Sequence, residues 1–222
     1  MTELTLEIRR AIHKAQYKGR LKNIKNIFDA LIKRVFDITA SIIGLIFSSP
    51  LAIFVYVLIK SDSPGNVIFK QRRVGKNGKV FKMLKFRSMR INAEEKTGPT
   101  WAVEGDSRVT KVGKFLRKTR LDELPQLVNV LNGDMSLVGP RPERPHFVEK
   151  FRQEIPNYDL RHSVRPGITG EAQIFNGYDT SFKDVMRKIQ YDLSYLKNKS
   201  IFYDIRLMFL TISVIFTGRG AQ

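Results

Sequence analysis

The feature that most restricts the fold is one apolar segment in the first third of the chain. Residues 35–59 read VFDITASIIGLIFSSPLAIFVYVLI, and Asp37 is the only charged side chain among them. A helix of this length can cross the hydrocarbon core of a bilayer, which is roughly 30 Å thick. The segment begins too late for a signal peptide and has no small-residue cleavage site. We therefore expect it to lie in a membrane.

Both flanks of this segment are basic. Nine Lys or Arg residues precede it between positions 9 and 34, and ten follow it between positions 60 and 90. The positive-inside rule places Lys/Arg-rich flanks in the cytoplasm, and here it places both flanks there. A segment that enters the bilayer and returns to the same side satisfies this rule.

A proline lies within the segment, at Pro50, directly after Ser48 and Ser49. Proline lacks the amide hydrogen of a helix and therefore kinks or breaks it, while nearby serine hydroxyls can bond the carbonyls that this frees. Each half is too short to cross the bilayer, so residues 33–60 are expected to form a re-entrant helix broken at Ser49-Pro50. The alternative is an ordinary transmembrane helix with a kink, because membrane helices tolerate proline.

The charge of the whole chain indicates an anionic partner. The 39 Lys and Arg residues outnumber the 21 Asp and Glu residues, which leaves a net charge of +18. Such an excess is typical of proteins that bind nucleic acid, an anionic membrane or a phosphorylated substrate. Residues 1–32 alternate apolar and basic positions, which predicts an interfacial amphipathic helix on anionic lipids. For residues 1–20, a solvated arm is the alternative. The absence of cysteine excludes disulfides and thiolate metal sites.

Residues 61–222 are expected to form a cytoplasmic domain, so that the chain as a whole is α+β and mainly helical. Strand-like residues 66–73 and 79–88 flank Asn77-Gly78, a strong signal for a small β-hairpin. Residues 92–108 are polar and rich in turn formers, so we expect a loop there. Periodicity and capping signals predict helices at 112–117, 124–131, 145–154, 182–198 and 203–216, the last of them either interfacial or packed on the membrane segment.

Two adjacent carboxylates, Asp122 and Glu123, lie where the predicted helix 124–131 begins. Free N–H groups and the positive end of the helix dipole stabilise an ionised carboxylate there. An ionised and positioned aspartate can act as a nucleophile, and its neighbour could hold a divalent cation. On spacing alone the pair is more typical of a capping box, because Thr119 precedes Asp122 by three residues.

Two further segments place arginines in stiff surroundings. Residues 139–145 (GPRPERP) alternate arginine with proline, and residues 165–170 (RPGITG) place Arg165 before a proline and two glycines. Proline restricts the backbone, so guanidinium groups held in this way lose little entropy when they bind phosphate oxygens. Tight turns with solvated arginines are the alternative interpretation.

Taken together, six segments resemble the monotopic polyprenyl-phosphate phosphoglycosyltransferases, the bacterial sugar transferase family. The resemblance covers about residues 30–217, and several of its motifs are long and occur in the family's order. The segments are KRVFD (33–37), SP (49–50), KFRSM (85–89), LDELPQL (121–127), NVLNGDMSLVGPRP (129–142) and VRPGITG (164–170).

The resemblance implies a fold and a reaction. The family has a re-entrant helix broken at Ser-Pro, interfacial helices and a small α/β catalytic part, and it uses Mg²⁺. It implies that Asp122 attacks the β-phosphorus of a UDP-sugar, that UMP leaves, and that undecaprenyl phosphate then takes the phosphosugar from Asp122. Glu123 would complete the catalytic pair and bind Mg²⁺. The arginines expected to bind the substrate phosphates are Arg87, Arg117, Arg141 and Arg165.

The same resemblance implies a location and a pathway. The protein is expected to be monotopic, at the cytoplasmic face of the bacterial inner membrane, and to start the assembly of an exopolysaccharide, capsule or O-antigen. The sequence of residues 141–145 is similar to that of exopolysaccharide-initiating members, which favours UDP-glucose or UDP-galactose over an N-acetylated sugar. The sequence leaves a homodimer open.

Two other classes of protein also fit part of the sequence. A non-enzymatic protein that docks on anionic membranes would explain the charge and the apolar segment, but it gives Asp122 and Glu123 no task. A nucleic-acid binder would explain only the charge. Few aromatic residues interleave with the basic stretches as a base-stacking surface needs, and the apolar segment has no use there, so we expect no nucleic-acid partner.

Overall fold

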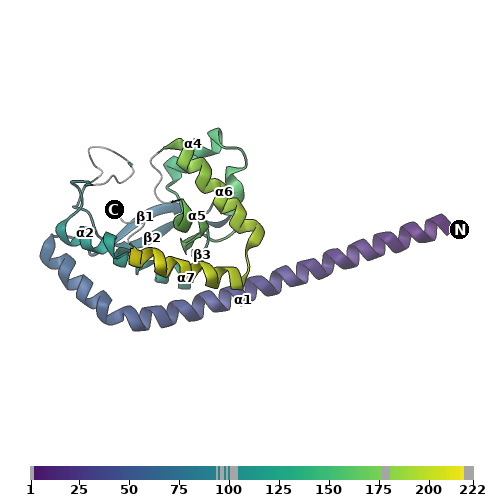
Figure 1. Ribbon diagram of the computed structural model, residues 1–222, viewed down its shortest axis with the longest axis horizontal. Coiled ribbons are helices and arrows are strands. Elements are labelled where there is room, and N and C mark those ends of the chain that lie inside the picture. Colours follow the sequence, from purple (N-terminus) through teal and green to yellow (C-terminus); the bar gives the residue numbers. More distant parts are fainter. Residues whose placement is uncertain are drawn as a thin grey trace. The chain divides into compact units, whose positions relative to one another are not determined.

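The computed structural model describes the backbone of residues 3–93, 95, 98, 100, 105–176 and 181–217. The described chain is mainly helical and has two small two-stranded sheets (Figure 1), which confirms the predicted α+β, mainly helical class. Met1–Phe36 forms one compact unit and Asp37–Gln222 another. The division into residues 1–32, 33–60 and 61–222 stays a prediction.

Helix α1 spans Glu3–Asp62 and contains the apolar segment. Within the described residues, its part from Ile27 to Asp62 is the one stretch long and apolar enough to cross a membrane. Many large apolar side chains of this part face outward, and Phe47 is 82% exposed. Exposed apolar surface on this scale is typical of a helix that contacts lipid. The side chains before Ile27, on which the predicted amphipathic N-terminal helix depends, lie outside the described residues.

The helix continues through Pro50, where the sequence predicts a break. Pro50 has no amide hydrogen to donate to the carbonyl of Ile46, four residues earlier. The hydroxyl of Ser49 donates to that same carbonyl over 2.8 Å, as the sequence suggested for the serines. Because this bond replaces the missing one, the helix bends instead of ending (Figure 1). The helix–break–helix expectation is therefore corrected to one bent helix.

Strands β1 (Ile68–Val74) and β2 (Val80–Phe86) form the predicted antiparallel hairpin. The turn between them contains Asn77 and Gly78, both with positive φ, the conformation that Asn-Gly favours. The other edge of β2 is closed by a side chain, since the Asn129 amide accepts from Leu84 N and donates to Lys82 O, each over 2.9 Å. One amide thus satisfies part of a strand edge that would otherwise be open.

The remaining elements match the predicted helices closely. The predictions 112–117, 145–154, 182–198 and 203–216 are confirmed to within two residues, whereas most of the predicted loop at 92–108 lies outside the described residues. A parallel pairing of β3 (Ser136–Val138) with β4 (Gly167–Thr169) is not predicted from the sequence. The helical elements are α2 Lys111–Lys118, η2 Leu121–Glu123, α3 Gln126–Asn132, α4 Pro145–Glu154, η3 Tyr158–Ser163, α5 Glu171–Phe175, α6 Phe182–Asn198 and α7 Ile201–Thr217.

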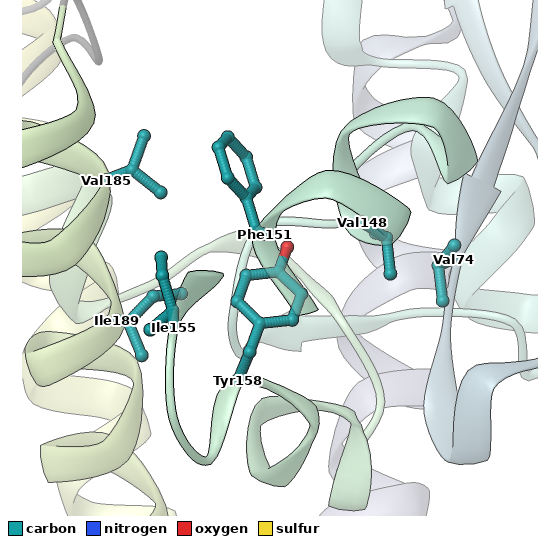
Figure 2. Close-up of a cluster of buried hydrophobic side chains, with 7 residues drawn as sticks. All are labelled: Val74, Val148, Phe151, Ile155, Tyr158, Val185 and Ile189. Carbon is teal, nitrogen blue, oxygen red and sulfur yellow. The ribbon is translucent and has the colours of Figure 1, made fainter. Parts of the chain in front are cut away.

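Two hydrophobic clusters hold these elements in place. In the first, Phe151 and Tyr158 lie between side chains of α6 and the end of β1 (Figure 2). In the second, Val55 and Ile59 near the end of α1 pack with Phe86 of β2 and with α2. The first cluster fixes α4, η3 and α6 around the segment that follows β3, and the second fixes the end of the apolar helix to the hairpin. The first cluster consists of Val74, Val148, Phe151, Ile155, Tyr158, Val185 and Ile189.

Candidate active site

A cavity of about 970 Å³ lies between the hairpin, η2 and the segment after β3. Its volume is at the upper end of the usual range for ligand pockets, roughly 300–1,000 Å³. Its charged lining consists of Lys70, Arg73, Lys85, Arg87, Arg90, Arg117, Arg120, Arg141 and Arg144, with Glu95, Asp122, Glu123 and Glu143 as the acids. Cations outnumber acids by more than two to one, so the cavity suits a ligand with several negative charges.

Asp122 and Glu123 belong to the short helical turn η2, which directly follows α2. The hydroxyl of Thr119 donates backward to the carbonyls of Phe115 and Leu116 and so closes the end of α2. It does not cap the next helix, and the capping-box interpretation of Asp122 is therefore wrong. Arg120 then adopts the left-handed conformation, with a φ of 60°, which turns the chain so that both carboxylates enter the cavity wall.

Both carboxylates are buried, with 5% of Asp122 and 8% of Glu123 exposed. Buried carboxylates are costly unless cations neutralise them. Lys85 Nζ lies 3.0 Å from Glu123 Oε1 and 3.7 Å from Asp122 Oδ2. Arg141 forms a fork to Glu123, with NH2 2.5 Å from Oε1 and NH1 3.3 Å from Oε2. Glu123 is thus held by two cations, whereas Asp122 has one more distant ionic contact.

The protonation of the two carboxyl groups differs accordingly. Burial alone would raise the pKa of Glu123, but Arg141 and Lys85 outweigh burial and hold this pKa well below its ordinary value. Burial raises the pKa of Asp122, partly offset by Lys85 and reinforced by the charge of Glu123. Adjacent acids with divergent pKa values are typical of sites in which each has its own chemical task. The expectation that Asp122 is kept ionised by a helix N-terminus is corrected: its counter-charge comes from Lys85.

Two of the predicted phosphate-binding arginines reach the carboxylate site. Arg141 bonds Glu123 directly, as described above. Arg117 lines the same cavity, and its Nε donates to the hydroxyl of Ser88 over 3.0 Å, which leaves its terminal nitrogens available toward the cavity. Their phosphate-binding role stays a prediction, and their position is compatible with it.

The other two predicted arginines carry backbone contacts. Arg87 lines the cavity, but it is buried, and its terminal nitrogens donate to the carbonyls of Pro64 and Ser63 over 2.7 and 2.6 Å. It therefore ties the end of α1 to β2. Arg165 donates from Nε to the carbonyl of Gly133 over 2.8 Å, at the C-terminal end of α3, where a cation also complements the helix dipole. Arg165 is not among the residues that line the cavity, and its phosphate-binding role stays a prediction.

Sequence reasoning missed several residues of the cavity wall, above all Lys85. Lys85 is part of the KFRSM motif, but its task depends on a partner 37 positions later in the chain. One signal could have found it, since strand alternation places its side chain on the same face as that of the buried Met83. A lysine on the buried face of a strand needs an acidic partner, and Asp122-Glu123 is the obvious candidate.

Comparison with known proteins supports the motif resemblance. A family model described as bacterial sugar transferase matches residues 28–218. The UDP-N-acetylgalactosamine-undecaprenyl-phosphate N-acetylgalactosaminephosphotransferase of Aeromonas hydrophila is 52% identical over 193 residues, 87% of this chain and 45% of that protein. The UDP-glucose:undecaprenyl-phosphate glucose-1-phosphate transferase of Escherichia coli (strain K12) is 45% identical over 193 residues, 86% of this chain and 41% of that protein.

A shorter relative is covered more completely. The protein called putative undecaprenyl-phosphate N-acetylgalactosaminyl 1-phosphate transferase in Bacillus subtilis (strain 168) is 55% identical over 148 residues, 64% of this chain and 82% of that protein. By contrast, the chain spans less than half the length of the Aeromonas and Escherichia proteins.

Proposed function

Because the chain belongs to the bacterial sugar transferase family, we propose that it transfers a sugar-1-phosphate from a UDP-sugar to undecaprenyl phosphate. The observation that carries this proposal is the pair of buried carboxylates, Asp122 and Glu123, in a cavity lined mainly by cations. A UDP-sugar and a lipid phosphate are both polyanions, which such a lining attracts. The relatives' names state the same pair of substrate classes.

Asp122 is the proposed nucleophile. One of its carboxylate oxygens forms a bond to the β-phosphorus of the UDP-sugar, the bond between that phosphorus and the bridging oxygen breaks, and UMP leaves with the bonding pair. An oxygen of undecaprenyl phosphate then attacks the same phosphorus and releases the carboxylate of Asp122. Glu123 is less suited to this task, because Arg141 and Lys85 already occupy its oxygens.

The cations around the pair have separate tasks. Lys85 partly offsets the effect of burial, which raises the pKa of Asp122, and so favours the ionised carboxylate. Arg141 and Arg117 are positioned to neutralise phosphate oxygens as negative charge moves onto the leaving UMP. A bidentate guanidinium such as Arg141 can transfer one of its two bonds from Glu123 to a phosphate without leaving the carboxylate unpaired.

Glu123 would hold Mg²⁺ together with substrate phosphate oxygens, and Arg141 or Lys85 would then release one of the Glu123 oxygens that they now contact. Among the described residues, no three His, Cys, Asp or Glu side chains gather into a metal-binding cluster. Glu123 and the substrate phosphates would form a donor set that suits Mg²⁺, because this ion is usually held by one or two carboxylates together with substrate phosphates and water. When bound, the ion would reduce the repulsion between the Asp122 carboxylate and the diphosphate.

The membrane arrangement is proposed to be re-entrant and monotopic, at the cytoplasmic face. Three observations support it: the basic flanks of the apolar segment, the bend stabilised by Ser49, and the outward-facing apolar side chains. Helix α7 also has outward-facing apolar side chains, with Phe209 69% exposed, and is proposed to lie at the interface. Gly65 and Asn66, which lie three and four residues beyond the end of α1, line the cavity, so a lipid phosphate near the end of α1 could reach it.

The sugar is proposed to be a hexose of the glucose or galactose series, with or without an N-acetyl group. The sequence of residues 141–145 favours an unacetylated sugar. Two relatives named for N-acetylgalactosamine are 52% and 55% identical, and relatives named for glucose are 42–45% identical, which favours UDP-N-acetylgalactosamine. We place UDP-N-acetylgalactosamine first, because overall identity samples more of the cavity wall than one short motif does.

The test is transfer itself. Purified protein in bilayer nanodiscs that contain undecaprenyl phosphate is incubated with radiolabelled UDP-N-acetylgalactosamine, UDP-glucose or UDP-galactose, and label in lipid and UMP release are both measured. We expect equal amounts of the two products with at least one sugar, none with Asp122→Asn, and normal transfer with Glu149→Gln, which changes an exposed acid on α4. Membrane binding without transfer for every sugar would favour a non-enzymatic membrane protein.

A further inference from the structure

The backbone around Arg141 is held at three successive carbonyls. The carbonyl of Arg141 accepts from Arg161 NH2 over 2.7 Å, and the carbonyl of Pro142 accepts from Arg73 NH1 over 2.8 Å. The carbonyl of Glu143 accepts from the amide of Val74 over 2.8 Å. The donors come from η3 and from the end of β1, so the loop that presents Arg141 is fixed from both sides.

The first of these donors is itself held by a buried acid. Arg161 is almost completely buried, and Asp192 of α6 accepts from it, with Oδ2 2.8 Å from Nε and 2.7 Å from NH2. The hydroxyl of Tyr158 accepts from Arg161 NH1 over 3.1 Å. A chain of contacts therefore runs from Asp192 through Arg161 to the backbone of Arg141.

A second contact chain starts one helical turn earlier on α6. Lys188 forms a buried ion pair with Glu143, and Arg73 NH1 lies 3.6 Å from the other oxygen of the same carboxylate. Lys188 and Asp192 are four residues apart and so share one face of α6. These ion pairs hold the pKa of Glu143 at about 2 in spite of burial, so the pairs stay charged.

Stability alone is a weak explanation for so many buried charges. Well-packed apolar side chains can often replace a buried ion pair without loss of stability. Here two ion pairs on one helix face converge on three consecutive residues, and the first of these residues carries the guanidinium that bonds Glu123. The arrangement fixes the backbone from which the Arg141 side chain extends. If a catalytic group is displaced by about 1 Å, the reaction rate can fall on the order of a hundredfold.

We propose that Asp192 and Lys188 of α6 are positioning residues for Arg141, acting through Arg161 and through Glu143. The proposal rests on the proposed function, because it assigns them a role in the transfer reaction. Under this proposal, α6 influences the rate of transfer although it does not line the cavity. Neither residue touches the substrate, so their substitution changes kcat far more than the KM for the UDP-sugar.

The test compares single and double variants by single-turnover transfer. Asp192→Asn alone is expected to lower kcat by about 10- to 100-fold with KM changed less than threefold. In the background of Arg141→Ala, the same change is expected to lower the remaining rate less than threefold, because a positioning residue has no further task once its target is gone. A matched control is Arg152→Gln, which removes the exposed ion pair with Asp159 and should leave the rate unchanged.

Other outcomes overturn the proposal. It fails if Asp192→Asn has the same effect with and without Arg141, or if Arg152→Gln slows transfer as much. If Asp192→Asn does not fold, Tyr158→Phe takes its place, because it removes one hydrogen bond to Arg161. Tyr158→Phe is expected to lower kcat by a few fold when Arg141 is present and to have a smaller effect in the Arg141→Ala background. If Asp122→Asn retains transfer, the proposed function itself fails. If Asp122→Asn is inactive and the double variants are additive, only the positioning role fails.

Discussion

The ammonium nitrogen of Lys85 lies 3.7 Å from Oδ2 of Asp122. This relationship joins a strand of the hairpin to the turn that follows α2, and it supplies the counter-charge of the proposed nucleophile. Burial raises the pKa of Asp122, and Lys85 is the strongest influence in the opposite direction. The ionised form needed for attack on phosphorus therefore depends on Lys85.

Lys85→Met is expected to shift the acid limb of the pH–rate profile to higher pH. The carboxylate is the reactive form, so activity falls as pH decreases through the pKa of Asp122. Removing Lys85 removes an interaction that lowers this pKa. The acid limb of the pH–rate profile therefore moves to higher pH. The measurement is kcat/KM against pH, with Lys82→Met, at an exposed position of the same strand, as the control. An unchanged limb in Lys85→Met would refute the assignment.

Glu143→Gln is expected to lower stability at neutral pH and to lose this effect in acid. The pKa of Glu143 lies at about 2 because Lys188 and Arg73 outweigh its burial. A carboxyl pKa depressed in the folded state stabilises the fold above the unfolded value, about 4.5, and this contribution disappears as pH falls toward 2. Its full size is on the order of 3 kcal/mol.

The measurement for Glu143 is thermal unfolding in detergent between pH 7 and pH 2. The difference in Tm between the natural protein and Glu143→Gln should narrow below about pH 4.5. Glu149→Gln, on the exposed face of α4, should give no difference at any pH. A Tm difference for Glu143→Gln that stays constant across the range would contradict the low pKa.

Asn129→Leu is expected to destabilise the hairpin edge. The substitution removes two hydrogen bonds and leaves Leu84 N and Lys82 O without this partner. Each lost bond in a buried setting costs about 1–2 kcal/mol, so a total loss of about 2–4 kcal/mol is expected. Thermal unfolding checks it, with Asn132→Ala at the exposed end of α3 as the comparison. Equal Tm values for the two variants would show that the side chain does not support β2.

Both ends of the apolar segment are expected to be accessible from the cytoplasm only. The chain has no cysteine, so Asp29→Cys and Lys60→Cys each create a single labelling site. A membrane-impermeant thiol reagent should label both in inverted vesicles and neither in intact cells. Pro50→Ala restores the amide donor to Ile46, straightens the helix and should expose one end to the opposite side. Labelling of the natural segment from opposite sides would contradict the re-entrant path.

Local signals in the sequence predict most of the elements but few of their partners. Asn77-Gly78 marks the hairpin turn and Pro145 marks the start of α4, because these preferences act within a few residues. The pairing of β3 with β4 is not predictable in this way. A Cβ on Gly167 would lie 2.1 Å from the amide nitrogen of Gly139, so both glycines indicate close backbone contact, but the sequence does not say with which segment.

The candidate site shows the same limit. Asp122 and Glu123 are recognisable from their motif, but Thr119 also matches a capping pattern, and only the fold shows that its hydroxyl turns back to Phe115. Arg87 and Arg165 lie in motifs as prominent as that of Arg141. Their guanidinium groups nevertheless bond backbone carbonyls, because the charge of an arginine does not reveal which acceptor its surroundings provide.

The most direct test of the account is the chemical state of Asp122 during turnover. Protein incubated with a UDP-sugar in the absence of undecaprenyl phosphate is quenched, digested and examined by mass spectrometry. The account predicts a sugar-phosphate adduct on Asp122 that disappears when undecaprenyl phosphate is added and that never forms in Asp122→Asn. Transfer that proceeds with no adduct, or with the adduct on Glu123, would contradict it.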